Sequence, residues 1–209
     1  MVPPQALVLI RCFRIPFSTN VERVALAAGH KLIAVDWVDH DDGDRSAIRA
    51  LSGQDFVPVA ELDGQVITDS PVILRELERR VPDPPLWPAE PARRAEADIF
   101  VDWFNRVWKV APNRMAEGGH TPPEAVGLSE ELRGSLDRFE ALLDGRDFLL
   151  GAGFGIADVI AFPFLKYAAS IAPDDPDPFH HVLAEHLALG DAHERLRGWI
   201  GRCDALPRA

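Results

Sequence analysis

Residues 56–71, FVPVAELDGQVITDSP, contain two apolar runs that are separated by Asp63-Gly64 and followed by Ser70-Pro71. An Asp-Gly pair between apolar runs is the strongest short hairpin signal, so we predict strands over residues 56–62 and 65–68. Serine is a preferred N-cap, and proline suits the first helical position. Apolar residues then recur at helical spacing. The stretch therefore predicts a β-hairpin followed by a helix that Ser70 caps and that runs to about residue 80.

The residues before this hairpin change hydrophobic period repeatedly. Residues 7–12 form a short apolar run of strand length, residues 21–28 carry apolar side chains at helical spacing, and residues 33–38 alternate as a strand does. A helix that connects two parallel strands makes a βαβ unit. Residues 41–55 are polar and predict a loop with a short helix. The first part of the chain is therefore predicted to be βαβ followed by ββα.

The stretch after residue 81 marks a domain boundary. Residues 82–91, PDPPLWPAEP, contain five prolines, which neither a helix interior nor a central strand accepts. Beyond them the pattern is helical almost throughout. We predict an α/β domain over residues 1–81, a proline-rich linker over 82–91 and an all-helical domain over 92–209. The expected helices of the second domain are 92–110, 129–144, 156–170, 180–189 and 192–204.

The overall charge and the cysteine content exclude several classes of function. The chain has 22 Lys and Arg against 33 Asp and Glu, a net charge of −11. An acidic surface repels polyanions, so no nucleic-acid partner is expected. Two cysteines, Cys12 and Cys203, make neither a disulfide framework nor a metal cluster, which fits a reducing compartment and a cytoplasmic protein. The longest early apolar run is too short for a membrane span, so no membrane partner is expected.

The order of these elements resembles the cytosolic glutathione transferases. The resemblance rests on βαβ-ββα, on Val57-Pro58 at the start of the third strand, on Asp69-Ser70 at the N-terminus of the next helix, and on an all-helical second half. It implies an α/β plus all-α fold, with a thioredoxin-like N-terminal domain and a helical-bundle C-terminal domain. It also implies glutathione as co-substrate, no metal, an electrophilic small molecule as second substrate, and a twofold homodimer.

The segment between the first strand and the first helix carries the predicted catalytic residue, Ser18. Residues 16–24, PFSTNVERV, look like the family pattern Pro-x-Ser-x-Asn-x-x-Arg/Lys-Val, in which the serine hydroxyl hydrogen-bonds the sulfur of glutathione. A hydroxyl donor at a helix N-terminus favours the thiolate, which is the nucleophile. Two alternatives remain open. Ser18 only caps the helix, or the family's sulfur-binding position aligns with Ile15, which has no side-chain donor.

The resemblance assigns the rest of the glutathione site to two segments. Val57-Pro58 is expected to be cis, so that the backbone of Val57 pairs with the cysteinyl part of glutathione. Asp69 and Ser70 are expected to hold the γ-glutamyl end, where a helix N-terminus favours a carboxylate. Gln54, just before the strand, is placed like a polar residue that helps to bind the peptide.

Aromatic residues supply a candidate pocket for the second substrate. Phe13, Phe104 and Trp108, together with Trp103, could line an apolar site. Aromatic residues at spacings of three and four are otherwise typical of a helix core, and this alternative stays open.

Residues 155–158, Gly-Ile-Ala-Asp, resemble the family's Ser/Thr-x-x-Asp capping box with glycine in place of the hydroxyl residue. Its role would be structural.

The sequence thus favours an enzyme that stabilises the glutathione thiolate through Ser18 and adds it to an electrophilic, mostly apolar substrate. Two alternatives are a non-catalytic binding or scaffold protein of this fold, and an enzyme of the same fold that uses another low-molecular-weight thiol.

Overall fold

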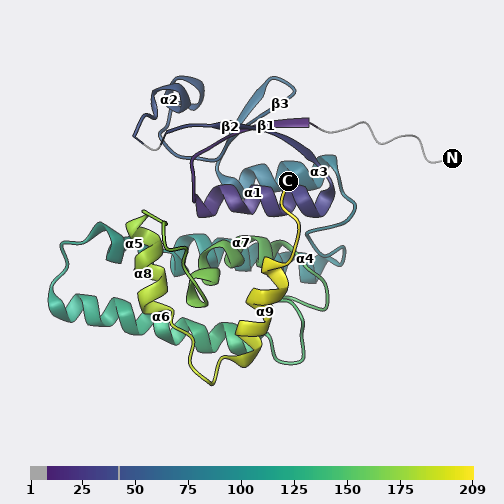
Figure 1. Cartoon of the computed structure of the whole chain (residues 1–209). Coiled ribbons are helices and arrows are strands. Elements are labelled where there is room, and N and C mark those ends of the chain that lie inside the picture. The colour runs from purple at the N-terminus through teal and green to yellow at the C-terminus, as the bar shows by residue number, and fades with distance from the viewer. Residues whose placement is uncertain (1–8, 42) are drawn as a thin grey trace. The chain divides into compact units, whose positions relative to one another are not determined.

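A computed structural model describes residues 9–41 and 43–209. The described chain divides into two compact units, which are drawn in Figure 1. The first holds residues 9–86 and Leu206–Ala209, and the second is Trp87–Ala205. No helix in the described residues is both long and apolar enough to cross a bilayer.

The first unit is built on a four-stranded sheet in the order β2-β1-β3-β4. β1 pairs with β2 in parallel, whereas β1 with β3 and β3 with β4 pair antiparallel. Helices α1 and α3 lie against each other on one face of this sheet (Figure 1). The arrangement confirms the predicted βαβ-ββα order and the thioredoxin-like fold. The elements are β1 Leu9–Arg14, α1 Thr19–Lys31, β2 Ala34–Asp39, α2 Ser46–Ser52, β3 Val59–Leu62, β4 Gln65–Thr68 and α3 Ser70–Arg80.

The hairpin and α3 form where residues 56–71 place them, with two corrections. Asp63 and Gly64 have φ of 50° and 78°, the positive angles that a two-residue hairpin turn requires. The third strand begins at Val59 and not at residue 56. The N-cap of α3 is Asp69 and not Ser70, which is the first helical residue. The prediction was one residue off because both residue types are good caps.

Buried polar contacts hold residues after α3 on the first unit. The Lys31 ammonium, fully buried, lies 2.6 Å from the Glu78 carboxylate and donates to the carbonyls of Val81 and Pro84 at 2.7 and 2.9 Å. Glu78 also accepts the N–H of Leu86 at 3.1 Å. These bonds explain why the first unit extends to residue 86, five residues beyond the predicted end of the α/β domain.

The last four residues of the chain also contact the first unit. Ala209 donates its N–H to Ala25 at 3.1 Å, and Trp37 donates its indole N–H to the Ala209 carbonyl at 2.9 Å. Gly29 makes this docking possible, because a Cβ at that position would lie 2.3 Å from the carbonyl oxygen of Pro207. The sequence placed this tail with the helical domain, since its docking depends on a tertiary approach that no local pattern records.

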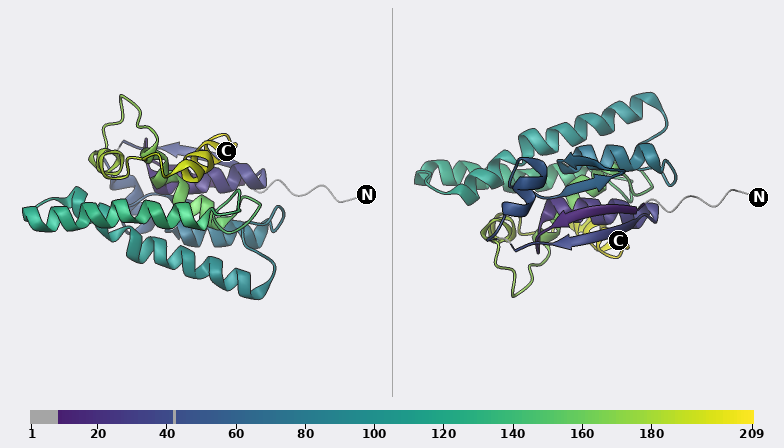
Figure 2. Two further views of the ribbon diagram at one scale, coloured as in Figure 1. Left: turned by 90° about the horizontal axis from the view of Figure 1, so that it is seen from below. Right: turned by 90° about the horizontal axis from the view of Figure 1, so that it is seen from above.

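The second unit is entirely helical. Figure 2 shows α4 and α6 running beside each other along this unit. Its elements are α4 Pro91–Trp103, a π-helical turn Phe104–Trp108, α5 Val110–Glu117, α6 Pro122–Leu142, α7 Ile156–Leu165, a 3₁₀ turn Lys166–Ala168, α8 Pro178–His186 and α9 Glu194–Asp204. The single helix expected over residues 92–110 is therefore divided into α4, the π-helical turn and α5, and the helical segment continues to Glu117. Helix α6 begins seven residues earlier than predicted, where Glu124 accepts the N–H of Thr121 at 2.8 Å and caps its first turn.

A buried carboxylate accepts hydrogen bonds from three segments of the helical unit. Asp158 in α7 accepts the N–H groups of Leu149 and Gly155, each at 2.9 Å, and the indole N–H of Trp199 at 2.7 Å. The bond to Gly155 is the half of the capping box that glycine leaves intact. Burial raises the pKa of Asp158 to about 6, against the lowering effect of these hydrogen bonds.

We expect the stabilising contribution of Asp158 to depend on pH. Its pKa is higher in the folded than in the unfolded chain, so this contribution is complete below about pH 4 and is lost as the pH rises through about 6. The difference in unfolding free energy between the parent and Asp158→Asn should therefore narrow by up to about 3 kcal/mol between about pH 4 and pH 7. Urea titrations followed by tryptophan fluorescence measure it, with exposed Asp191→Asn as control. A difference that widens over this range contradicts the prediction.

Candidate functional site

Ser18 is the N-cap of α1, directly after a turn in which Phe17 has φ of 61°. Its Oγ accepts the N–H of Val21 at 3.3 Å, so the cap predicted as an alternative role is present. A hydroxyl has one donor and two acceptor lone pairs. In the described part of the chain the Ser18 hydroxyl is bonded only as an acceptor. Its proton is therefore available to a ligand atom at the positive end of α1.

A buried arginine joins this helix to α3. Arg23 is fully buried, and its Nη1 donates to Asn20 Oδ1 at 3.0 Å and to Ser70 Oγ at 3.2 Å. Ser70 Oγ in turn lies 3.5 Å from Asn20 Oδ1. These bonds bring together the N-terminal turns of α1 and α3, which carry the predicted residues Ser18, Asp69 and Ser70. Sequence comparison with the family motif included Arg23, but nothing in the sequence predicted its burial or its bond to Ser70.

Asp69 combines an exposed carboxyl group with an unusual backbone. Its φ of 70° and ψ of 121° lie in a region that residues other than glycine rarely occupy. Its side chain makes no capping bond to α3, while its carbonyl accepts the N–H groups of Val72 and Ile73. Burial lowers the pKa of Arg23 to about 9, and the nearby Asp69 carboxylate opposes this shift. Arg23 is therefore still charged at neutral pH, and the exposed Asp69 carboxylate can take a ligand cation.

The Val57-Pro58 peptide bond is cis, as predicted. Val57 is 8% exposed and lies in an apolar cluster with Phe13, Val21 and Ile48. Neither backbone group of Val57 has a hydrogen-bond partner among the residues that the structure describes. Buried backbone groups are nearly always paired, so this position can still accept and donate one hydrogen bond each to an extended peptide.

Gln54 and Ile15 flank these segments. The Gln54 amide donates to the carbonyl of Phe56 at 3.3 Å and shapes the loop before β3. Ile15 is partly buried against the cluster that contains Val57. Its side chain offers no donor, so in this arrangement Ser18 is the residue between β1 and α1 that brings a side-chain hydroxyl.

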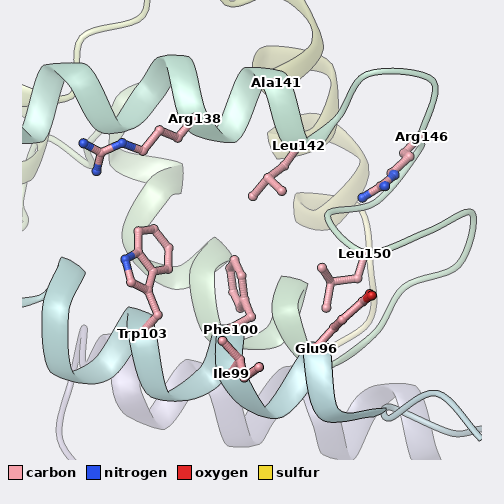
Figure 3. A pocket seen from close by; sticks show the side chains of 9 residues that line it. All are labelled: Glu96, Ile99, Phe100, Trp103, Arg138, Ala141, Leu142, Arg146 and Leu150. Atoms are coloured by element: carbon pink, nitrogen blue, oxygen red, sulfur yellow. The ribbon is translucent and has the colours of Figure 1, made fainter. Parts of the chain in front are cut away.

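Three of the four aromatic residues predicted for the second substrate are buried within their units, and the fourth, Trp103, is half buried at the end of α4 (Figure 3). Phe13 is 8% exposed and stacks on His40 at 5.5 Å. Phe104 is 0% exposed and Trp108 is 4% exposed. Their rings stack with a distance of 4.4 Å between the ring centroids. They form part of the core of the helical unit, the alternative that their spacing also allowed.

Cys12 and acidic clusters add no further chemistry to this site. Burial raises the pKa of the Cys12 thiol to about 12, partly offset by Arg14, so the thiol is protonated at neutral pH. In the described ranges no group of three or more His, Cys, Asp or Glu side chains is placed to hold a metal ion.

Comparison with known proteins agrees with this fold. The family model described as glutathione S-transferase, N-terminal domain, matches residues 13–85, and that described as glutathione S-transferase, C-terminal domain, matches residues 102–202. A crystal structure of rice GST1 (OsGSTU1) in complex with glutathione has a TM-score of 0.77 and 21% identity. That alignment covers 96% of this chain and 88% of the rice chain.

Two curated relatives differ in what their names describe. The chain is 26% identical to glutathione S-transferase U7 of Arabidopsis thaliana over 148 residues, 70% of this chain and 63% of that protein. It is 33% identical to FtsZ-localized protein A of Caulobacter vibrioides over 114 residues, 48% of this chain and 49% of that protein. The alignments thus span less than two thirds of either relative.

Together, the mixed four-stranded sheet with its cis proline and the helical unit that follows it in the chain define a thioredoxin-like domain followed by a helical bundle. With both family models matched, the chain belongs to the glutathione S-transferase family.

The contact between Arg23 and Ser70 gives a stability prediction. Removal of either partner breaks the same hydrogen bond, so the two losses should not add. Arg23→Met and Ser70→Ala should each lower the unfolding free energy, and the double variant should lose about 1 kcal/mol less than the sum. Urea titrations of the four proteins measure this coupling. If the losses in unfolding free energy of the two single variants add up to that of the double variant within error, the bond contributes nothing to stability.

Proposed function

We propose that this protein binds glutathione in its first unit, stabilises the thiolate and transfers the sulfur to an electrophilic, mostly apolar small molecule. The observation that carries the proposal is the network of Arg23, Asn20 and Ser70, which joins the N-terminal turns of two helices. Both helix ends present partial positive charge, and one of them carries an available hydroxyl proton. Family membership supports glutathione as the ligand.

Each predicted residue has a distinct role in this proposal. The N-terminal turn of α3 and Ser70 take the γ-glutamyl carboxylate, and the Asp69 carboxylate takes the adjacent ammonium. The free backbone groups of Val57 pair with the cysteinyl backbone, and Gln54 orders the loop that precedes them. Ser18 donates its proton in a hydrogen bond to the sulfur, which favours loss of the thiol proton to solvent.

The chemical step needs little more than this arrangement. The thiolate lone pair attacks the electrophilic carbon, a sulfur–carbon bond forms, and the leaving group departs with its electron pair. A thiol has a pKa near 8.5, so lowering it toward neutrality increases the nucleophilic fraction. Holding both reactants in place supplies the rest of the rate.

Retention on immobilised glutathione, followed by an assay with an aryl halide such as 1-chloro-2,4-dinitrobenzene, tests the function. We expect retention, elution by free glutathione, and turnover. Retention without turnover would favour the second candidate, a binding or scaffold protein, which the partial similarity to FtsZ-localized protein A supports. No retention, with turnover by another low-molecular-weight thiol, would replace glutathione as the co-substrate.

The role of Ser18 can be separated from its role as a helix cap. Ser18→Ala should raise the pKa of the bound thiol by about one unit and lower turnover at neutral pH about tenfold, because the donor to sulfur is lost. It should also cost about 1 kcal/mol of stability through the lost cap. Ser18→Asp keeps a capping acceptor but has no proton to donate at neutral pH, so it should fold like the parent and lose turnover.

The thiolate absorbance of the complex across a pH series measures the pKa, with Ser46→Ala, an exposed serine at the start of α2, as control. If Ser18→Asp keeps full turnover and an unchanged thiol pKa, Ser18 is a structural cap and the sulfur is stabilised elsewhere.

We also propose a twofold homodimer, as the family resemblance implies, because closed twofold symmetry is the commonest oligomer. Light scattering at micromolar concentration should give about twice the 23.1 kDa mass of the chain. A particle of single-chain mass at that concentration would exclude the dimer for the free protein.

A further inference from the structure

Residues 206–209, which we call the tail segment, lie along one face of α1, and Figure 1 marks the C-terminal end of the chain beside this helix. Three α1 residues that contact the tail segment are spaced by four and three, so they share one side of the helix. They are Gly29, Ala25 and Glu22. The backbone of the tail segment therefore runs from the C-terminal end of α1 toward the turn that carries Ser18.

The tail segment places one guanidinium, that of Arg208, beside the first turn of α1. Its Nη1 donates to the carbonyl of Leu206 at 2.7 Å, and its Nη2 donates to Glu22 Oε1 at 3.1 Å. The side chains of Arg208 and Glu22 are 27% and 17% exposed, whereas those of the Arg14–Asp39 pair are 37% and 70% exposed. The pair between Arg208 and Glu22 is therefore better shielded from solvent and less weakened by salt.

Glu22 has two opposite effects at the start of α1. It is the acidic residue of the first turn, and its N–H donates to the Ser18 carbonyl at 3.0 Å. A carboxylate there stabilises the helix, because it interacts with the positive N-terminal end. The same negative charge opposes a second anion at that end. A thiolate held by Ser18 is such an anion, so an unpaired Glu22 would weaken the site that α1 provides.

Two further pairs of opposite charge lie at this end of the first unit. Arg23 of α1 interacts with the Asp69 carboxylate of α3. Arg14, at the end of β1, lies 2.6 Å from Asp39 at the end of β2. The carboxylate in the first turn of α1 takes its counter-charge from the tail segment instead. Loss of Arg208 would therefore leave one negative charge in excess near Ser18.

We propose that Arg208 is a positioning residue for the thiol site of the first unit, because it pairs with Glu22 and keeps the start of α1 favourable to a thiolate at Ser18. The inference rests on the proposed function where it concerns glutathione. The charge effect itself belongs to α1 and acts on any thiol at its N-terminus. In this proposal Arg208 contacts neither the sulfur nor the electrophile and acts through Glu22. A tail segment that only stabilised α1 would not change the ionisation of a thiol in the folded protein.

A thiol introduced by Ser18→Cys tests the proposal on the full chain without glutathione. Its pKa follows from the rate of alkylation by iodoacetamide across a pH series, and the native Cys12 and Cys203 do not compete because both are buried. Adding Arg208→Gln should raise the pKa of the introduced thiol by about half a unit. Glu22→Gln should lower it, and the two changes together should return it close to the value of the Ser18→Cys protein.

Two variants serve as matched controls in the same background. Arg208→Lys keeps the positive charge and should leave the pKa of the introduced thiol unchanged. Arg79→Gln removes the same charge from the first unit, at an exposed ion pair with Glu76 near the far end of α3, and should also leave it unchanged.

Two results would overturn the proposal. One is a shift with Arg208→Gln that is no larger than the shift with Arg79→Gln. The other is a raised pKa that persists when Glu22→Gln is added, because Arg208 would then not act through Glu22. In the protein that retains Ser18, Arg208→Gln should raise the pKa of bound glutathione in the same direction. A shift of the introduced thiol in a protein that does not bind glutathione would support the charge coupling and count against the proposed function alone.

Discussion

The geometry of the candidate site depends on one buried guanidinium. Arg23 lies on α1 and donates to Ser70 at the start of α3, so separating the two helix ends would break a hydrogen bond to a buried charge. Breaking a buried charged contact costs far more than a surface ion pair contributes. The cost of burying Arg23 is visible in its pKa, which falls to about 9 and still leaves it charged at neutral pH. A fixed cation beneath two helix N-termini adds to their own positive ends and favours an anionic ligand above them.

The elements that sequence predicted well are those whose signal is local. Asp63-Gly64 dictates its own turn, because both residues take positive φ there, and the apolar residues of α3 repeat over its whole length. The cis bond at Val57-Pro58 was predicted from the family resemblance and confirmed. The predicted site residues Ser18, Asp69 and Ser70 were likewise named from sequence. Their grouping at adjoining helix ends is seen in the bonds of Arg23 to Asn20 and Ser70, and their roles toward a ligand remain predictions.

Of the features that the sequence analysis missed, two arise from tertiary contacts and one from a local helix cap. Helix α6 starts at Pro122, but Gly127 and Gly134 dilute its apolar pattern, and its first turn is exposed and held by a cap instead of a core face. The docking of Ala209 on α1 requires the bare Cα of Gly29 to lie against Pro207. The extension of the first unit to residue 86 depends on Lys31, whose burial against Glu78 no periodicity predicts. The docking of the last residues and the extension to residue 86 depend on contacts between residues far apart in the chain. The start of α6 depends on a cap, which a search for hydrophobic periodicity does not detect.

The two units use their aromatic and charged residues for different purposes. In the first, a few polar side chains are fixed by hydrogen bonds at the N-terminal turns of α1 and α3. In the second, Phe104 and Trp108 pack in the core, whereas Trp103 is only half buried. A ring that packs inside a core stabilises the fold but cannot receive a ligand. The position of an aromatic residue relative to the core, more than its spacing in the sequence, therefore decides whether it supports the fold or forms a site.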